Sequence, residues 1–462
     1  MKKLLLNGTI VNEGRSYIGS IAIEGDTISA VLEGKLSVEV AYRRFEGYEI
    51  TDCTGLLLLP GLIDDQVHFR TPGLTHKGDI ASESRAAVAG GVTSYMDMPN
   101  TKPPTIDYEA LMAKRDYAAE HSYGNYGFFF GGTNTNCQEA LKIDTRLIPG
   151  LKLFLGSSTG NMLVDDERAL DCFFSEFPLP IAIHSESETI IRQNKARAIE
   201  QWGEDPPIEY HPLIRSEEAC YRCTAEALER ATKYGTNLHV LHLSTAKETA
   251  LFDAADPMEI RRITAEVCIH HLWFNDGDYA EKGTLIKWNP AIKTESDREA
   301  LLEGVRTGRI SVIATDHAPH LLSEKQGGAL KAASGGPLAQ FGLLVLLELV
   351  GRGELPLELI PTKTAHYPAL RFAVQKRGFL RPGYYADIVV VNPECPTAVT
   401  KDVILSKCGW SPFEGTTFKH SVEATYVNGT CVYKRGELLD VPSPAMAPVS
   451  YTHLTLPTTP YV

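Results

Sequence analysis

The sequence contains no long hydrophobic run, no excess of basic residues and no regular set of paired cysteines. No stretch approaches the ~20 apolar residues of a membrane-spanning helix, and the N-terminal MKKLLLNGTIV has too few apolar residues for a secretion signal. The formal net charge of −13 argues against binding to nucleic acid or to an anionic membrane, but it is silent on small molecules. We therefore expect a cytoplasmic protein with a large core and more than one domain.

The nine cysteines are scattered and odd in number, which fits a reducing compartment. Cys220 and Cys223 form a single C-x-x-C pair within SEEACYRCTAEALERA, a segment with the pattern of an amphipathic helix. Residues three apart share one face of a helix, and no second pair accompanies this one. The pattern favours ordinary packing over a structural zinc site or a redox site.

Both ends of the chain contain short β-like runs separated by turn residues. Residues 1–59 include YIGSIAIEGDTISAVL with a Gly-Asp turn, and residues 376–443 include SVEATYVNGTCVYKRGELL with an Asn-Gly turn. We expect these two segments to form one small β domain. The chain closes with the uncharged SYTHLTLPTTPYV, so residues 444–462 are expected to be a disordered or non-native tail.

Residues 60–375 alternate short apolar strands with helical stretches. The strands are expected in LLLLPGLID, GVTSYMDMP, GLKLFLGS, LPIAIHSE, NLHVLHLS and RISVIATDHAP. This rhythm predicts an α/β fold, a (β/α)8 TIM-like barrel with a small β domain formed by the N- and C-terminal segments. In such barrels the active site forms at the C-terminal ends of the strands.

Polar side chains that could bind a metal or take part in catalysis follow these strands. They are His68, Arg70, Asn100, Lys152, His184, His242, Asp316, His317 and His320. One histidine at a strand end is more often a hydrogen-bonded structural residue than a ligand. Several histidines, one lysine and one aspartate at the ends of different strands are hard to explain by packing, and they match the ligand types of a catalytic zinc site.

Lys152 and Asp316 suggest the chemistry of such a site. Lys152 lies within an apolar run, and burial would lower the pKa of its amine, which could then add carbon dioxide and bridge two metals as a carbamate. A divalent ion lowers the pKa of a bound water to about 7. Asp316 could take the proton of the attacking water and return it to a leaving nitrogen. The implied reaction is hydrolysis of an amide-like C–N bond, or its reverse.

Arg70 indicates the kind of substrate. It follows His68 by two residues on an extended segment, so the two side chains should share a face. A guanidinium group binds a carboxylate through two parallel hydrogen bonds, and Asn100 and His320 are further donors. The alternative role for Arg70 is a surface salt bridge.

In combination these motifs resemble the dihydroorotases of the cyclic amidohydrolase superfamily. The resemblance rests on PGLIDDQVHFRTPGLTHKGDI, GGVTSYMDMPNTKPPT, the lysine of GLKLFLG, IHSE, HLST, KWNPAIKTESDREAL and IATDHAPH, and it extends to about Leu439. It implies a zinc enzyme that interconverts dihydroorotate and N-carbamoyl-L-aspartate in pyrimidine (UMP) biosynthesis. It also implies a homo-oligomer, dimer or tetramer, with aspartate transcarbamoylase as a candidate partner.

The resemblance assigns a role to each matched residue. The metal ligands would be His68, Lys152 as a carbamate, His184, His242 and Asp316, and Asp316 would also be the catalytic acid and base. The substrate-binding residues would be Arg70, Asn100 and His320 at the carboxylate, with Asn289 and the Gly335-Gly336-Pro337 turn against the ring.

Two residues depart from the family pattern. Gln66 replaces the first histidine of the usual His-x-His, and Thr71 stands where an acidic residue usually follows the arginine. An amide oxygen is a harder and weaker zinc ligand than imidazole, although Gln66 is on the same face as His68. We expect one tightly bound zinc and a second, weaker site with Gln66 as a possible ligand, partly occupied or filled by another divalent ion.

Two other functions remain open at this point. A hydantoinase, dihydropyrimidinase or allantoinase would share the metal ligands, but the position of Arg70 is not typically arginine in those enzymes. A non-catalytic scaffold for aspartate transcarbamoylase is favoured by Gln66 and opposed by the other retained ligands. The leading prediction is an active dihydroorotase.

Overall fold

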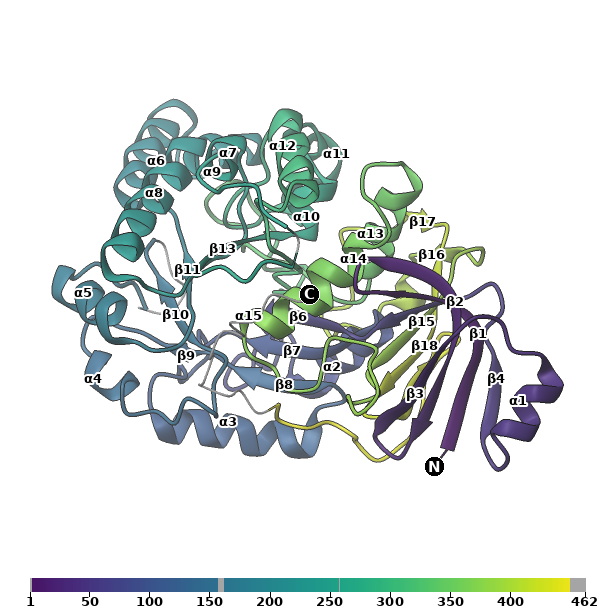
Figure 1. The fold of residues 1–462 in the computed structure, drawn as a ribbon. Coiled ribbons are helices and arrows are strands. Elements are labelled where there is room, and N and C mark those ends of the chain that lie inside the picture. The colour runs from purple at the N-terminus through teal and green to yellow at the C-terminus, as the bar shows by residue number, and fades with distance from the viewer. Residues whose placement is uncertain (1, 157–161, 257, 449–462) are drawn as a thin grey trace.

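The computed structural model describes residues 2–156, 162–256 and 258–448. Two β structures organise the chain, a parallel barrel and a separate sheet to which both ends contribute (Figure 1). The expected α/β fold, a TIM-like barrel with a small terminal β domain, is confirmed.

The small β domain unites the two ends of the chain in one sheet. Its strand order is β20-β19-β18-β15-β5-β1-β2-β3, with β4 also paired to β1. These strands are β1 (Lys2–Asn12), β2 (Arg15–Glu24), β3 (Thr27–Glu33), β4 (Glu49–Asp52), β5 (Leu57–Pro60), β15 (Ile388–Asn392), β18 (Ser421–Val427), β19 (Thr430–Lys434) and β20 (Glu437–Leu438). A separate hairpin pairs β16 (Thr397–Ala398) with β17 (Thr417–Phe418).

The barrel strands run parallel to one another. They are β6 (Leu62–Val67), β7 (Val92–Asp97), β8 (Asn125–Phe128), β9 (Phe130–Gly131), β10 (Leu151–Phe154), β11 (Ile181–His184), β12 (Leu238–Val240), β13 (Ile263–Cys268) and β14 (Val312–Ala314). A parallel bridge between Val67 and His317 brings the end of β6 beside the segment that follows β14. Strands β8, β9 and β13 lie outside the segments in which strands are expected from the sequence.

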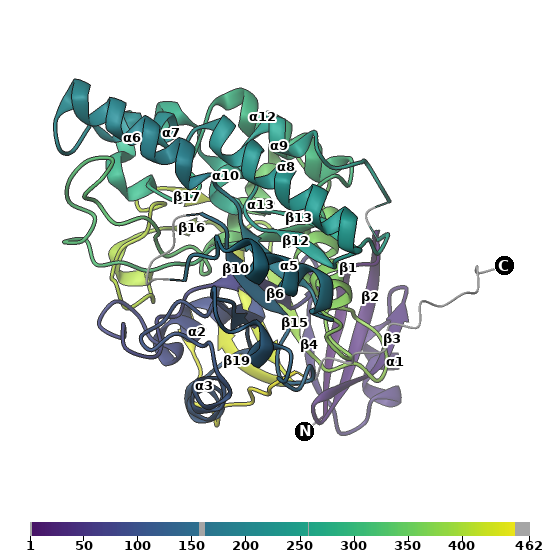
Figure 2. The same cartoon turned by 90° about the vertical axis from the view of Figure 1, so that its left-hand side faces the viewer.

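Helices surround the barrel. The longer ones are α2 (Ile80–Ala89), α3 (Tyr108–His121), α5 (Glu167–Glu176), α6 (Glu188–Trp202), α8 (Glu217–Tyr234), α12 (Glu295–Arg306) and α13 (Gly342–Gly351). The short ones are α4 (Cys137–Ala140), α7 (His211–Ile214), α9 (Ala246–Thr249), α10 (Ile269–Trp273), α11 (Tyr279–Lys282), α14 (Leu359–Pro361) and α15 (Tyr367–Arg371). Helix α1 (Val38–Arg44) packs instead against the small β sheet (Figure 1). In both views α6, α8 and α12 lie on one side of the barrel strands and α3 lies on the other (Figures 1 and 2). Among the described residues, no helix is both long enough and apolar enough to cross a membrane.

The segment LLLLPGLID, expected as one strand, divides at Gly61. Strand β5 belongs to the small sheet and β6 to the barrel, and the Gly61 N–H donates to the carbonyl of Asp387 in the small domain. A Cβ at Gly61 would lie 2.2 Å from Thr93 Oγ1 on β7. Glycine is required because the chain passes so close to its neighbour as it changes sheet.

Strand β6 carries a bulge near its C-terminal end. Asp64 pairs with Tyr95 and Val67 pairs with Asp97, so β6 has one residue more than β7 over this interval. Such an extra residue interrupts the alternation of side chains. Asp65 and Gln66, which are adjacent in the sequence, are both buried.

The cysteines and the C-terminal segment add two findings. Cys137 and Cys172 form a disulfide between α4 and α5 that the sequence analysis does not predict, and Cys220 and Cys223 pack buried in α8 as expected. Residues 444–448, placed in the expected tail, contact the barrel at β8. The carbonyl of Met446 accepts from the N–H of Tyr126 at 3.1 Å, and its N–H donates to Asn125 Oδ1 at 3.0 Å. The structure thus describes residues 444–448 against the barrel, and the rest of the expected tail, residues 449–462, lies outside the described residues.

Candidate active site

One group of predicted ligands converges on Asp316, two residues after β14. Asp316 Oδ1 lies 3.2 Å from His68 Nε2 and 3.3 Å from Gln66 Nε2. Gln66 Oε1 in turn accepts from the thiol of Cys268 at 3.6 Å. Gln66 thus reaches the same point as His68, and a half-turn of its amide would present the oxygen there instead of the nitrogen.

A second group contains the two other predicted histidines. His184 Nδ1 and His242 Nε2 are 3.0 Å apart, and His184 Nε2 is 2.9 Å from Glu186 Oε2. Burial lowers the pKa of both imidazoles, and for His242 the lowering is large. Both rings are therefore neutral near pH 7, which is the form that binds metals.

Lys152 lies in β10 and is 1% exposed, so its expected burial is observed. Burial lowers the pKa of its amine to about 7, against the opposing charges of Asp316 and Glu266. A substantial fraction of the amine is therefore unprotonated at neutral pH and able to react with carbon dioxide.

These side chains are of the types that bind a divalent metal ion. His68 Nδ1 is 2.8 Å from the side-chain oxygen of Asn100, which favours the tautomer that leaves Nε2 unprotonated toward Asp316. His184 Nδ1 and His242 Nε2 face each other at 3.0 Å, while His184 Nε2 lies 2.9 Å from the carboxylate of Glu186 as its outer partner. Neutral imidazoles oriented by an outer partner and a nearby carboxylate are the donors that zinc prefers.

Backbone conformation also marks the site. Arg70, His242 and Asp316 have φ of 68°, 40° and 49°, a left-handed region that residues other than glycine rarely adopt. Such conformations persist only where the surrounding structure enforces them, and they concentrate at functional sites.

The predicted carboxylate-binding residues lie at the same end of the barrel. Arg70 is 6% exposed, and its Nε donates to the carbonyl of Pro319 at 3.0 Å. The described residues provide no acceptor for its two terminal nitrogens. His320 Nδ1 lies 3.1 Å from Lys77 Nζ and 3.3 Å from Glu324 Oε2, and burial lowers its pKa strongly, so its ring is neutral.

The residues expected against the ring lie on two loops that meet. Asn289 Oδ1 accepts from Ser334 Oγ at 3.1 Å, and Gly336 and Pro337 are buried. A Cβ at Gly336 would lie 2.8 Å from the ring of Trp410 and 2.9 Å from that of Trp288. Gly336 is thus required by two tryptophan rings, which the sequence analysis does not single out.

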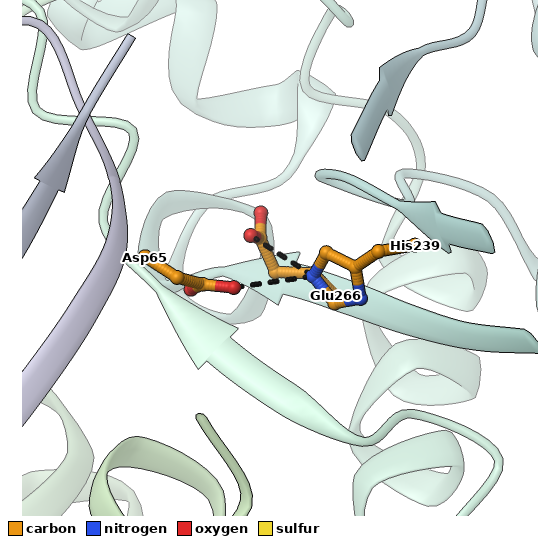
Figure 3. Close-up of side chains that lie close together, drawn as sticks. All are labelled: Asp65, His239 and Glu266. Carbon is orange, nitrogen blue, oxygen red and sulfur yellow. Dashed lines mark ion pairs between the residues drawn. The ribbon is translucent and has the colours of Figure 1, made fainter. Parts of the chain in front are cut away.

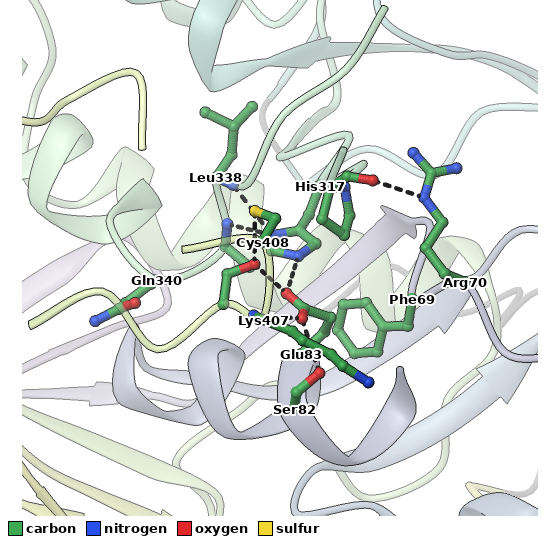
Figure 4. A network of polar contacts seen from close by, with 12 residues as sticks. Phe69, Arg70, Ser82, Glu83, His317, Leu338, Gln340, Lys407 and Cys408 are labelled. Atoms are coloured by element: carbon green, nitrogen blue, oxygen red, sulfur yellow. Dashed lines mark hydrogen bonds and ion pairs between the residues drawn. The ribbon is translucent and has the colours of Figure 1, made fainter. Parts of the chain in front are cut away.

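His317 connects the segment of Asp316 to its surroundings (Figure 4). Its Nδ1 accepts from the backbone N–H groups of Leu338 and Ala339 at 3.0 Å each, so its Nε2–H donates to Glu83 Oε2 at 2.8 Å. Its carbonyl accepts from the N–H of His68 at 2.7 Å. Glu83, on α2, is absent from the sequence-based set because nothing near it in sequence indicates its partner.

A further polar cluster lies in the barrel beside this site (Figure 3). It joins Asp65, His239 and Glu266, all 0% exposed. Glu266 Oε1 accepts from the N–H of His242 at 3.0 Å and lies 3.4 Å from Cys268 Sγ. Sequence reasoning misses this cluster because Asp65 turns inward through a bulge and Glu266 belongs to the unrecognised strand β13.

Known proteins match both the sequence and the fold. The profile of the amidohydrolase family matches residues 57–432, so the chain belongs to this family. A dihydroorotase from Halobacterium salinarum is 33% identical over 438 residues, which cover 93% of this chain and 96% of the relative. An allantoinase from Bacillus velezensis is 31% identical over 415 residues, which cover 88% and 90%.

Among solved structures, the L-hydantoinase from Arthrobacter aurescens matches with a TM-score of 0.89. It is 24% identical, the match covers 97% of this chain and all of that chain, and it shows the fold alone. The chain is a cyclic amide hydrolase acting on a small molecule, in a family that is generally metal-dependent.

Proposed function

We propose that the chain is a dihydroorotase, which interconverts dihydroorotate and N-carbamoyl-L-aspartate in pyrimidine biosynthesis. The observation that carries the proposal is the position of Arg70. Its two terminal nitrogens are left without acceptors from the described residues, while its neighbour His68 approaches Asp316. A buried guanidinium fork beside the reacting groups suits a cyclic amide that bears a carboxylate.

In this proposal the chain's own residues bind the substrate and move one proton. Arg70, with Asn100 and His320, binds the ring carboxylate, and Asn289, Gly336 and Pro337 contact the ring. Asp316 takes the proton from the attacking water and gives it to the ring nitrogen as the C–N bond breaks. The metal, held by His68, Lys152, His184, His242 and Asp316, would supply a nucleophile at neutral pH and polarise the carbonyl.

Lys152 would bind the metals as a carbamate, because burial leaves much of its amine unprotonated. We propose zinc as the metal, with one tight site and a second site weakened by Gln66. We further propose a cytoplasmic homo-oligomer, dimer or tetramer, with aspartate transcarbamoylase as a candidate partner.

The second candidate function is a carboxylate-free cyclic amidase. This candidate is motivated by the Bacillus velezensis allantoinase, which is nearly as similar to the chain as the dihydroorotases are. A non-catalytic scaffold is the third, motivated by Gln66.

Turnover of dihydroorotate and of dihydrouracil, which lacks the ring carboxylate, tests the proposal. Hydantoin and allantoin complete the substrate set. We expect kcat/KM to be highest for dihydroorotate. Arg70→Lys should remove about 1.5–3 kcal/mol of transition-state stabilisation for this substrate and lower its kcat/KM accordingly. The same variant should leave turnover of dihydrouracil unchanged. A preference for a carboxylate-free ring would establish the second function, and metal-loaded protein inactive on every substrate would establish the third.

A further inference from the structure

Three polar side chains from three strands converge inside the barrel (Figure 3). Asp65 comes from the bulge of β6, His239 from β12 and Glu266 from β13. His239 Nε2 lies 3.2 Å from Asp65 Oδ2 and 3.7 Å from Glu266 Oε2. The cluster is separate from the predicted catalytic ligands, none of which belongs to it.

Four atoms of this cluster lack a hydrogen-bond partner among the described residues. They are both carboxylate oxygens of Asp65, Nε2 of His239 and Oε2 of Glu266. Buried polar atoms nearly always have a partner, because an unpaired one retains the full cost of losing water. One such atom from each of the three residues lies within 4.8 Å of the others, which indicates something that binds between them.

The hydrogen bond made by Nδ1 of His239 indicates which ring nitrogen carries a hydrogen. Its Nδ1 lies 2.7 Å from Thr264 Oγ1, and that hydroxyl donates its single hydrogen to the carbonyl of Leu238 at 3.3 Å. Nδ1 must therefore carry the hydrogen that Thr264 accepts. In the neutral ring Nε2 then presents a lone pair toward two carboxylates, an arrangement that needs a cation between them.

A proton on Nε2 is the competing explanation. It would make the ring an imidazolium ion, whose N–H should then point at a carboxylate oxygen. Asp65 Oδ2 and Glu266 Oε2 lie 3.2 and 3.7 Å from Nε2 and raise the pKa of the ring against the effect of burial, but neither oxygen has the geometry of a hydrogen bond with Nε2. A shared ion satisfies all four atoms, whereas a proton would satisfy two.

Neighbouring cations do not neutralise the cluster by direct contact. The charge of Asp65 acts on Arg371 and that of Glu266 acts on Lys152. In the described part of the chain, neither cation forms an ion pair with either carboxylate. An imidazolium ring at His239 would bring one positive charge to the two buried carboxylates, whereas a divalent ion would offset both.

We propose that Asp65, His239 and Glu266 bind a structural zinc ion that is distinct from the catalytic metals. One imidazole nitrogen and two carboxylate oxygens are donors that zinc accepts, and the second oxygen of Asp65, which also lacks a hydrogen-bond partner in the described part of the chain, would be the fourth. Thr264 is the outer partner that orients the imidazole. The proposal does not depend on which cyclic amide is the substrate.

This ion would support both parts of the catalytic site. Asp65 directly precedes Gln66, and Glu266 accepts a hydrogen bond from the backbone of His242. The ion would thus hold together three strands, two of which lead to predicted catalytic ligands. Because the cluster is fully buried, the ion would be bound during folding and retained afterwards.

Zinc content of the purified full chain after dialysis against a chelator tests the proposal. A background variant combining Lys152→Ala, His184→Asn and Asp316→Asn disables the catalytic metal ligands. We expect this variant to retain about one zinc per chain, as a closed site should. Adding Asp65→Asn should remove that zinc, whereas adding the matched change Asp64→Asn, at a buried carboxyl outside the cluster, should not.

A folded background variant without zinc would overturn the proposal, as would equal zinc content with Asp65→Asn and Asp64→Asn. Because the multiple variants could fail to fold, a second measurement uses the native chain. A zinc-edge anomalous map should show a peak between the three side chains. Ordered side chains with no peak, or a direct hydrogen bond from His239 Nε2 to a carboxylate, would overturn it.

Discussion

The two parts of the candidate catalytic site use different donors at one end of the barrel. On one side His184 and His242 bring two neutral imidazole nitrogens to within 3.0 Å of each other. On the other side His68 and an amide, Gln66, approach one oxygen of Asp316 at 3.2 and 3.3 Å. We call these the imidazole side and the amide side. The comparison shows that an amide at residue 66 reaches the same carboxylate oxygen as His68, so the donor type differs between the two sides while the approach to Asp316 is kept.

The two sides also differ in their outer partners. The imidazole side is supported by the ionic pair of Glu186 with Arg215. The amide side is supported by the Cys268 thiol, whose pKa is raised by burial and which is therefore neutral. A charged partner strengthens a ligand more than a neutral thiol does. The imidazole side should therefore be the tighter one.

The largest expected effect comes from removing the acid and base of the amide side. Asp316→Asn should lower kcat by about 10²–10⁴-fold, the usual contribution of proton transfer by a positioned side chain. Steady-state assays of dihydroorotate hydrolysis measure it. Asp64→Asn is the control, because burial raises the pKa of Asp64 to about 8 and its carboxyl is largely neutral already. An Asp316→Asn enzyme within a few-fold of native activity would remove Asp316 from the mechanism.

Lys152→Ala should be next in size, because it removes the proposed link between the two sides. Metal content and activity should fall together, by more than the roughly 10–100-fold caused by loss of an outer partner. Short carboxylic acids should partly restore activity by replacing the missing oxygens. Lys363→Met is the matched control. Burial lowers the pKa of Lys363 to about 7 as well, but its amine donates a hydrogen bond to the carbonyl of Ile310 and is not a predicted metal ligand. Equal metal loss in both variants would count against the carbamate.

The pKa of Lys152 predicts how assembly depends on pH. Only the unprotonated amine adds carbon dioxide, and that form is lost as the pH falls through about 7. Metal-free protein reconstituted with zinc and bicarbonate should regain activity several-fold more completely at pH 8 than at pH 6, when both samples are assayed at one pH. Reconstitution that is independent of pH would contradict a carbamate at Lys152.

Glu83→Gln tests how the amide side is positioned. Glu83 reaches the segment of Asp316 through His317, so it acts as a positioning residue (Figure 4). We expect kcat to fall by a factor that corresponds to about 1–2 kcal/mol, with KM nearly unchanged. Glu248→Gln, at a buried carboxyl of α9, is the matched control. A change in KM alone, or an equal effect in Glu248→Gln, would show that His317 does not transmit the effect.

The smallest effect should come from making the two sides alike. Gln66→His should raise zinc occupancy on the amide side while changing kcat by less than about tenfold, because the proposed catalytic residues are untouched. Gln66→Met, which keeps the length but removes the amide, should lower that occupancy. Identical occupancy in all three proteins would show that residue 66 is not a ligand.

Sequence reasoning located the residues that follow regular strands. Lys152, His184 and Asp316 each lie in or just after a strand with a clear apolar pattern, and parallel strands bring their ends together. It could not find Asp65, because a bulge that turns a side chain inward has no local signature. It also missed Glu83, whose partner His317 is far away in sequence. Contacts between distant segments depend on packing, which periodicity does not reveal.

Zinc-edge anomalous diffraction from a single crystal of the native chain tests the difference between the two sides most directly. The account predicts a strong peak beside His184 and His242, and a weaker zinc peak beside His68 and Asp316. Two peaks of equal strength at full occupancy would contradict it.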